Sequence, residues 1–126
     1  MALGGLYLQN DILGAAMQAT VIRNDVISNN IANAEVPSYK RKGLRFESVL
    51  REHLDSGLVK TQADLEKIVP QIWTLDAGYS YRLDGNNVDI QTEMSDLYQN
   101  SVRYDVLAGG IMNNYRMIQA VINGIK

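Results

Sequence analysis

The sequence lacks several residue types on which common functional sites depend. Its 126 residues include no cysteine, a single histidine and only two prolines. Without cysteine, the chain can form no disulfide framework, zinc ribbon, iron–sulfur cluster or thiol nucleophile. The histidine, His53, is accompanied by no phosphate-binding glycine loop, G-x-S-x-G turn or H-E-x-x-H pair anywhere in the chain. We therefore expect no catalytic, cofactor or metal site, and we interpret His53 as a surface residue.

Long apolar runs and a strong excess of one charge are also absent. The longest uncharged stretch near the start, Ile12 to Ile22, contains polar residues and is too short to cross a bilayer. The first basic residue is Arg23, so we expect no cleaved secretory signal. The net charge is −2, with 12 basic and 14 acidic residues, which disfavours nucleic acid as a partner. A chain of this length forms one domain at most.

Basic residues are concentrated in the middle of the sequence. Residues 37–60 carry six basic and three acidic groups, whereas both flanking segments are net acidic. The densest basic cluster consists of Lys40–Lys42 and Arg45. Because a basic middle between acidic flanks suits self-association, we expect this cluster to pair with acidic surfaces of a neighbour or to remain in solvent.

Apolar residues recur every three or four positions near both ends of the chain. A 3.5-residue repeat kept over about five heptads is typical of a helix with a coiled-coil seam. A helix cannot bury such a stripe by itself, so each stripe needs the other helix, a neighbouring subunit, or both. We expect an assembly interface made of Leu8, Ile12, Ala15, Ala19, Ile22, Val26, Ile90, Met94, Leu97, Tyr104, Ala108, Ile111, Tyr115, Ile118, Ile122 and Ile125.

The sequence thus predicts a mainly α fold in a single unit. An N-terminal helix with its elbow (1–36) is followed by a basic loop and a mixed or irregular middle segment (37–85), and then by a C-terminal helix (86–126). The two long helices are expected to pack as a coiled-coil-like hairpin.

Residues that favour helix ends mark these boundaries. Pro37 ends the first helix, because proline forces the residue before it out of the helical conformation. Asn33 is the expected left-handed residue at that helix end. Asp84–Asn87 is a turn-forming cluster, and Asn86 with Asp89 resembles the capping pair of the last helix.

The middle segment is expected to hold short elements. Phe46–Leu54 and Thr61–Val69 each resemble a short helix, and Thr61 with Asp64 offers a cap for the second. Ile72–Leu83 has the character of a loop or hairpin. Its local anchors are Trp73, Tyr79 and Tyr81.

The pair Gly109-Gly110 lies inside the predicted C-terminal helix, where each glycine costs about 1 kcal/mol relative to alanine. One interpretation is a tolerated soft spot. The other is close approach by another backbone, for which the alanine-rich stripe at Ala15, Ala16 and Ala19 is suited. The sequence leaves both open.

Two local sequences resemble those of a known family. The segment from Val26 to Lys42 is similar to the S-N-N-I-A-N-A-x-T-P-G-Y-K signature of bacterial flagellar axial proteins, the rod and hook components. The family's usual Thr and Gly are replaced by Val36 and Ser38, and serine argues against a conformation that only glycine adopts readily. The matching residues are Ser28, Asn29, Asn30, Ile31, Ala32, Asn33, Ala34, Pro37, Tyr39 and Lys40.

The second segment resembles the one that opens the C-terminal helix in members of the membrane-proximal rod. The short chain agrees with that subgroup, because hook and distal-rod members insert large domains between the helices. The residues that carry this resemblance are Asp84, Gly85, Asn86, Asn87, Val88 and Asp89.

The resemblance implies a structural subunit of the flagellar basal-body rod, the drive shaft that transmits torque and encloses the export channel. Implied partners are copies of itself, other rod subunits, the rod-base adaptor protein, the inner-membrane ring and the flagellar type III export apparatus. The implied location is the periplasmic rod, reached without a cleaved signal peptide, and no nucleic acid, small-molecule substrate or cofactor is implied. Another proximal-rod subunit and a non-flagellar coiled-coil adaptor or export chaperone are the alternatives.

Overall fold

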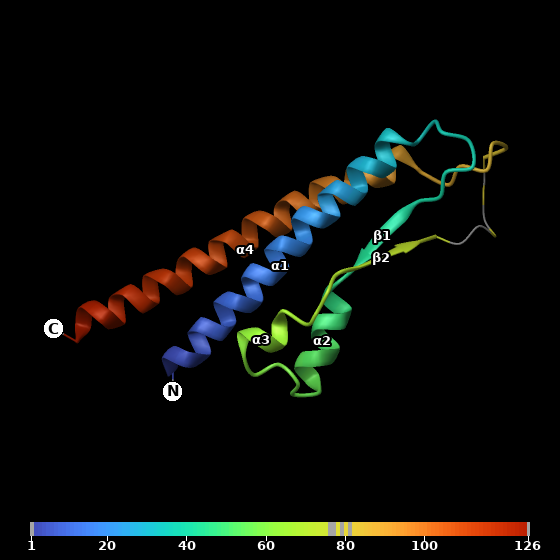
Figure 1. Cartoon of the computed structure of the whole chain (residues 1–126). Coiled ribbons are helices and arrows are strands. Elements are labelled where there is room, and N and C mark those ends of the chain that lie inside the picture. The colour runs from blue at the N-terminus through green and yellow to red at the C-terminus, as the bar shows by residue number, and fades with distance from the viewer. Residues whose placement is uncertain (1, 76–77, 79, 81, 126) are drawn as a thin grey trace.

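Two long antiparallel helices dominate the molecule, and a small mixed segment lies against one of them (Figure 1). The computed structural model describes residues 2–75, 78, 80 and 82–125. The predicted mainly α fold is confirmed. The elements are α1 (Ala2–Ala32), β1 (Lys42–Arg45), α2 (Glu47–Asp55), α3 (Gln62–Leu65), β2 (Gln71–Thr74) and α4 (Ile90–Gly124).

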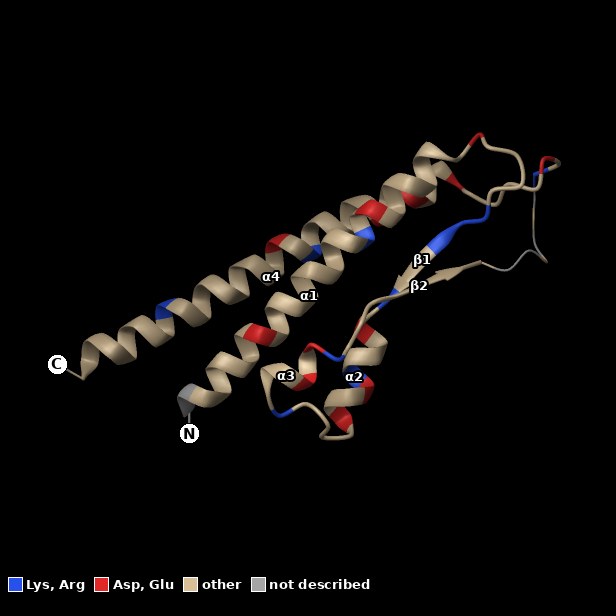
Figure 2. Cartoon of the chain, in the orientation of Figure 1, with Lys and Arg blue, Asp and Glu red and all other residues tan. Residues whose placement is uncertain are grey.

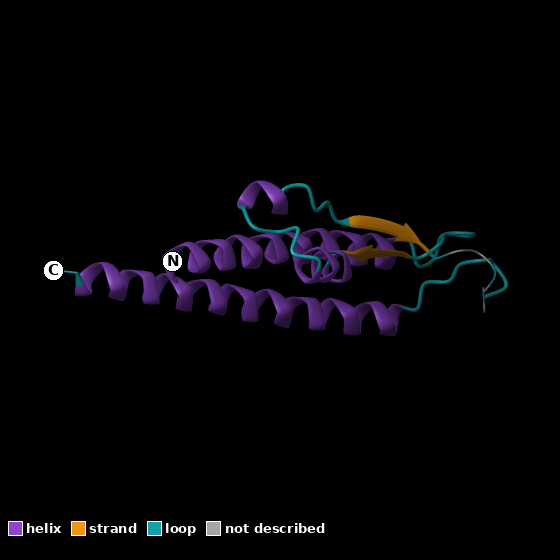
Figure 3. Ribbon diagram, turned by 90° about the horizontal axis from the view of Figure 1, so that it is seen from below, coloured by secondary structure: helices purple, strands orange, loops and turns teal. Residues whose placement is uncertain are grey.

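The helix α1 lies between α4 on one side and the middle segment on the other, as the turned view shows (Figure 3). Its apolar stripe packs on the middle segment around Phe46, the single phenylalanine, which is 2% exposed. Each residue of this stripe is therefore buried or half-buried within the chain. The buried core consists of Ala19, Phe46, Leu50, Val59, Leu65 and Ile68, flanked by Leu8, Ile12, Ala15, Ala16, Leu44 and Val49.

The contact between α1 and α4 is unexpectedly polar. Asn100 donates to the Thr20 carbonyl at 2.7 Å, and Asn114 donates to the Asn10 side chain at 3.0 Å. Asn100 and Asn114 are buried. Because buried amides stabilise a helix pair only when they find partners, such contacts set the register of the two helices. The predicted helix pairing is confirmed, and it includes two polar α4 residues, Asn100 and Asn114, that lie outside the predicted apolar stripe.

The glycine pair does not interrupt α4, which continues to Gly124. A Cβ added to Gly110 would lie 3.4 Å from Leu13, whereas Gly109 faces open space. Gly110 therefore marks a close approach to α1 by a side chain rather than by a backbone.

The strands β1 and β2 pair antiparallel, with Gly43 opposite Trp73. A Cβ on Gly43 would lie 2.4 Å from the Trp73 ring, so the glycine makes room for the indole. The segment Ile72–Leu83 was predicted to have the character of a loop or hairpin; its first residues belong to β2, which pairs with β1 from far earlier in the sequence. Tyr79 and Tyr81 lie outside the described residues.

Helix limits follow capping chemistry. Thr61 and Asp64 form the predicted capping box on α3, with the Asp64 carboxylate accepting from the Thr61 hydroxyl at 2.9 Å. Together with bonds from backbone amides, this bond lowers the pKa of Asp64 to about 2. Asp89 caps α4 by accepting from the Gln91 amide at 3.1 Å. The predicted start at Asn86 is wrong by four residues, because the Asn86 side chain is used elsewhere.

Candidate functional site

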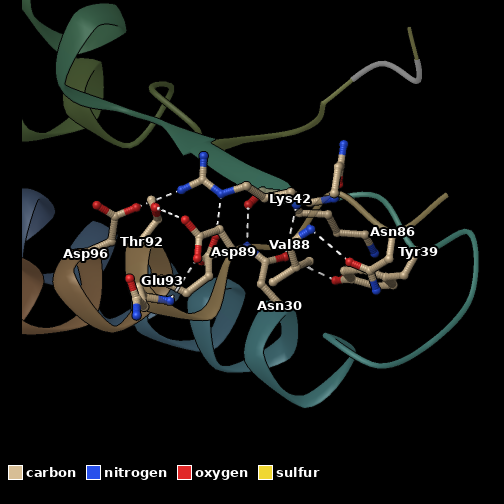
Figure 4. Close-up of polar contacts among 12 residues, drawn as sticks. Asn30, Tyr39, Lys42, Asn86, Val88, Asp89, Thr92, Glu93 and Asp96 are labelled. Carbon is tan, nitrogen blue, oxygen red and sulfur yellow. Dashed lines mark hydrogen bonds and ion pairs between the residues drawn. The ribbon is translucent and has the colours of Figure 1, made fainter. Parts of the chain in front are cut away.

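The two family-like segments meet at one end of the helix pair, where Asn30 is fully buried. Its amide nitrogen donates to the Lys42 carbonyl at 2.8 Å and to Glu93 at 3.1 Å. Its amide oxygen accepts from the Lys42 amide at 3.0 Å and from the Tyr39 hydroxyl at 3.1 Å. Every hydrogen-bonding position of this side chain is therefore used, and Asn30 joins α1, β1 and α4 (Figure 4).

The carboxylate of Glu93 is buried at the start of α4 and lies next to Asn30. The Arg41 guanidinium binds it and also contacts Asp96, at 2.7 Å. A buried carboxylate needs such a partner, because its desolvation costs several kcal/mol. Burial and the negative charge of Glu93 raise the pKa of Tyr39, so Tyr39 remains a hydrogen-bond donor to Asn30 at neutral pH.

The basic cluster was expected to pair with a neighbour or to remain in solvent, and it divides into two halves. Lys42 and Arg45 are exposed on β1. Arg41 forms ion pairs with Glu93 and Asp96 of the same chain, and the Lys40 ammonium donates to the Gly85 carbonyl at 2.5 Å. The prediction is therefore wrong for Lys40 and Arg41, because both find their partners within the chain.

Asn86 closes the end of α1. Its amide nitrogen donates to the carbonyls of Asn33 and Val36, at 2.9 and 2.8 Å, and its oxygen accepts from the Val88 amide at 2.8 Å. Arg82 donates to the Ala34 carbonyl at 2.9 Å. Asn86 and Arg82 thus supply partners for carbonyls of the turn that follows α1, which ends at Ala32.

Ser38 has the left-handed backbone expected of Asn33, with φ of 61°. The prediction for Asn33 is wrong, because Ser38 is the one non-glycine residue with a positive φ among the residues that the structure describes. The argument from serine against a glycine-like conformation at Ser38 is also wrong. The Ser38 amide donates to the Asp84 carbonyl at 2.9 Å, and this contact holds the strained residue in place.

We call Asn30, Tyr39, Arg41, Asn86 and Glu93 the junction. Of the other motif residues, Asn87 joins it by accepting from the Arg41 amide at 2.6 Å, and Ala34 and Val88 are buried beside it. The structure leaves Ser28, Asn29, Ala32 and Pro37 exposed, and Ile31 half-buried.

The predicted assembly residues divide into three groups by burial. Three of them, Ala19, Val26 and Ile118, are buried within the chain. Others are half-buried, namely Leu8, Ile12, Ala15, Ile22, Leu97, Ala108 and Ile111. The exposed members all lie on α4 or directly after its end, and they are Ile90, Met94, Tyr104, Tyr115, Ile122 and Ile125.

The middle segment is held to both helices by one carboxylate. Glu47 at the start of α2 forms a bidentate ion pair with Arg23 of α1, at 2.6 and 2.5 Å, and lies 3.7 Å from Arg103 of α4. Burial opposes ionisation of Glu47, but the hydrogen bonds from Arg23 and the two positive charges outweigh it and lower the pKa of Glu47.

Comparison with known proteins identifies the two segments. A sequence profile described as "Flagella basal body rod protein" matches residues 11–40. The chain is 31% identical to a Bacillus subtilis protein named flagellar basal body rod protein FlgB, over the full length of both chains. It is 29% identical to the Escherichia coli K12 protein of that name, over 83% of this chain and 88% of the relative. The chain belongs to the FlgB family of flagellar basal-body rod proteins.

Two members of the junction in this FlgB-type chain were not predicted as site residues. Arg41 was assigned to the basic loop, and Glu93 was noted only as part of the helix into which the second family-like segment leads. A usable signal is the spacing of Glu93, Asn100 and Asn114, which are separated by seven and fourteen residues. Polar residues at heptad spacing point to one face of a helix, and that face of α4 contacts α1.

No three His, Cys, Asp or Glu side chains in 2–75, 78, 80 and 82–125 are grouped so that they could hold a metal ion. Over the same residues, none of the helices is both long and apolar enough to span a bilayer.

Proposed function

We propose that this chain is a structural subunit of the flagellar basal-body rod, at its membrane-proximal end, and that it acts by assembly rather than by catalysis. The observation that carries the proposal is the 31% identity with a FlgB protein over the whole of both chains. An export chaperone or a free adaptor would have no reason to share that full length with rod proteins.

The exposed stripe of α4 is the surface that supports assembly best. Tyr115, Ile122 and Ile125 are each more than half exposed, at 59%, 55% and 77%. Burial of one such side chain contributes about 1.5–3 kcal/mol, and a surface of this kind on a long helix is unusual unless a partner covers it. Many modest contacts then add up over an assembly.

The junction would give every subunit the same shape. Because Asn30 and Glu93 are buried and fully partnered, the angle between the helix pair and the middle segment is fixed before neighbours are added. A shaft that transmits torque needs subunits of uniform geometry, since a soft joint would yield under load.

The finer assignment is part of the same proposal. Copies of the chain, other rod subunits, the rod-base adaptor and the inner-membrane ring would be its neighbours in the periplasm. The chain would reach that place through the flagellar type III export apparatus, without a cleaved signal, and would help to enclose the export channel. Its surface would bind no nucleic acid and no small-molecule substrate.

Deletion of the gene in its native host, followed by electron microscopy of purified basal bodies, tests the function. We expect rings without a rod or filament, restored by the wild-type gene. Intact rods and normal swimming in the deletion strain would contradict the proposal, and the free-standing coiled-coil adaptor would replace it.

A further inference from the structure

A groove of about 500 Å³ lies between α1 and the α3 side of the middle segment. Its α1 wall is one face of that helix, since Asp11, Gly14, Gln18 and Ile22 follow one another at steps of three or four residues. The facing wall is formed by α3 and the residues that connect it to β2. The volume is within the range of clefts that bury a ligand.

The floor of the groove is apolar. It is made of the core residue Phe46 with Leu65 and Ile68 beside it, and all three are buried. At the rim, Val69 is 66% exposed. A Cβ added to Gly14 would meet nothing within 4 Å, so the α1 wall is open at that point. The groove therefore favours apolar side chains, which would displace water from these surfaces.

Each wall of the groove carries one carboxylate. Asp11 lies on α1, and Glu66 directly follows α3. Among the described residues, neither carboxylate forms an ion pair, and no lysine or arginine lines the groove. Figure 2 shows acidic positions both on α1 and at α3. A cationic partner would complement these charges, whereas an acidic partner would be repelled.

We propose that this groove binds a segment of a second, non-identical protein in which two basic side chains stand among apolar ones. We call this segment the guest. Its apolar side chains would cover Phe46 and Val69, and its two cations would pair with Asp11 and Glu66. The inference rests on the proposed function, because the second protein would be another component of the rod or of its base.

A second copy of this chain does not supply such a guest from its exposed helix α4. The basic residues of α4 are Arg103 and Arg116, which are about 20 Å apart along the helix, so no short stretch of α4 presents two cations. Lys42 and Arg45 are closer together, but β1 is paired with β2 along one edge and with Asn30 along the other. The two carboxylates of the groove therefore favour a different protein.

Photocrosslinking in the full chain identifies the guest. The photoreactive variant Val69→p-benzoylphenylalanine carries the label at the rim, and basal bodies are purified from the native host after irradiation. Mass spectrometry should show a crosslink to one protein other than this chain, at a segment with two lysines or arginines among apolar residues. The same label at Glu52, which is exposed on α2 outside the groove, should not give that crosslink.

The outcomes separate this inference from the proposed function. Basal bodies that contain the labelled chain but give no crosslink from the rim would overturn the groove assignment and leave the function standing. A crosslink to a second copy, or to a segment without basic residues, would also overturn it. Where the Val69 variant is not incorporated, a label at Gln62, exposed on the same wall, gives the same measurement. Absence of the unlabelled wild-type chain from basal bodies would overturn both proposals.

Removal of the two carboxylates tests the charge complementarity. Asp11→Asn/Glu66→Gln should lower the crosslink yield per incorporated chain about tenfold or more, because both cations of the guest would lose their partners. Its thermal stability should stay the same. Asp25→Asn/Asp55→Asn removes the same charge at exposed positions outside the groove, and should change the yield less than about twofold. An undiminished yield in Asp11→Asn/Glu66→Gln would contradict the proposal.

A larger side chain on the α1 wall tests the shape of the groove. Gly14→Leu fills open space and improves helix propensity, so thermal stability should be kept or raised. The crosslink yield should nevertheless fall about tenfold or more, because the leucine would exclude the guest. Gly5→Leu, which also meets nothing within 4 Å but lies outside the groove, is the matched control and should not lower the yield. A full yield in Gly14→Leu would show that the guest does not enter the groove.

Discussion

The apolar stripes of α1 and α4 have the same spacing in sequence but opposite surroundings in the structure. The α1 stripe is covered by the middle segment, and Ala19 at its centre has no exposed surface. Much of the α4 stripe is bare, with Tyr115 and Ile122 more than half exposed. A heptad repeat therefore predicts that a face will be covered, but not whether the cover comes from the same chain or from another. The difference predicts that equal substitutions on the two stripes will have unequal effects on folding.

The largest expected loss of stability comes from a charge on the α1 stripe. Ala19→Asp places a carboxylate at a fully buried position, where the cation one turn away, Arg23, is already bound to Glu47, and should lower the free energy of unfolding by at least about 3 kcal/mol. Thermal unfolding followed by circular dichroism measures the change. Gln18→Asp, at the adjacent exposed position, is the control and should change it by less than about 0.5 kcal/mol. A stable Ala19→Asp chain would mean that the middle segment does not cover α1 in solution.

A smaller loss is expected at the junction. Asn30→Asp keeps the shape of the side chain but removes both donors, and it sets a carboxylate beside Glu93. The Lys42 carbonyl would lose its hydrogen bond, and two carboxylates would lie side by side, so the free energy of unfolding should fall by about 2–3 kcal/mol. Asn24→Asp on the exposed side of α1 is the matched control, with an expected change below about 0.5 kcal/mol. Equal stability of the two variants would show that the junction is open in the isolated chain.

The sequence predicts the helices of this molecule better than the contacts that join distant segments. The capping box at Thr61 and the two long helices follow from local propensity and apolar spacing, which act over a few residues. The junction does not, because Asn30 and Glu93 are 63 residues apart and neither has a partner that a short window of sequence contains. Arg41 was predicted to pair with a neighbouring subunit or to remain in solvent, because its partners Glu93 and Asp96 also lie more than 50 residues away in the sequence.

The left-handed backbone conformation of Ser38 was not predicted either, but for a different reason. Serine rarely adopts a positive φ, so propensity alone argues against it. Contacts formed by the second segment, 46 residues later for the Asp84 carbonyl, outweigh that local preference. The family-like motif located the right residues there, whereas propensity assigned the wrong conformation.

A still smaller effect on stability is expected at the cap of α3, which belongs to the middle segment that packs on α1. The folded pKa of Asp64 is about 2, below its ordinary 3.8, so its contribution is complete above pH 4 and is lost as the pH falls through 2. Asp64→Asn should therefore show a weaker loss of stability between pH 4 and 2 than the wild type. Glu66→Gln, which is exposed, should leave that pH dependence unchanged. An unchanged profile in Asp64→Asn would mean that the cap is not formed in solution.

The smallest change in stability, and the sharpest contrast, is expected on the α4 stripe. Tyr115→Asp introduces the same group as Ala19→Asp, but at a position that is 59% exposed. The free energy of unfolding should change by no more than about 0.5 kcal/mol, and export should continue, yet basal bodies should lack the chain because the carboxylate would be buried in the assembly. Asn113→Asp, two residues away and exposed, controls for added charge on α4. Normal rods with Tyr115→Asp would show that the exposed stripe of α4 is not an interface. A large loss of stability would show that Tyr115 is part of the folded core. Only a stable chain that fails to assemble agrees with a stripe that a neighbouring subunit covers.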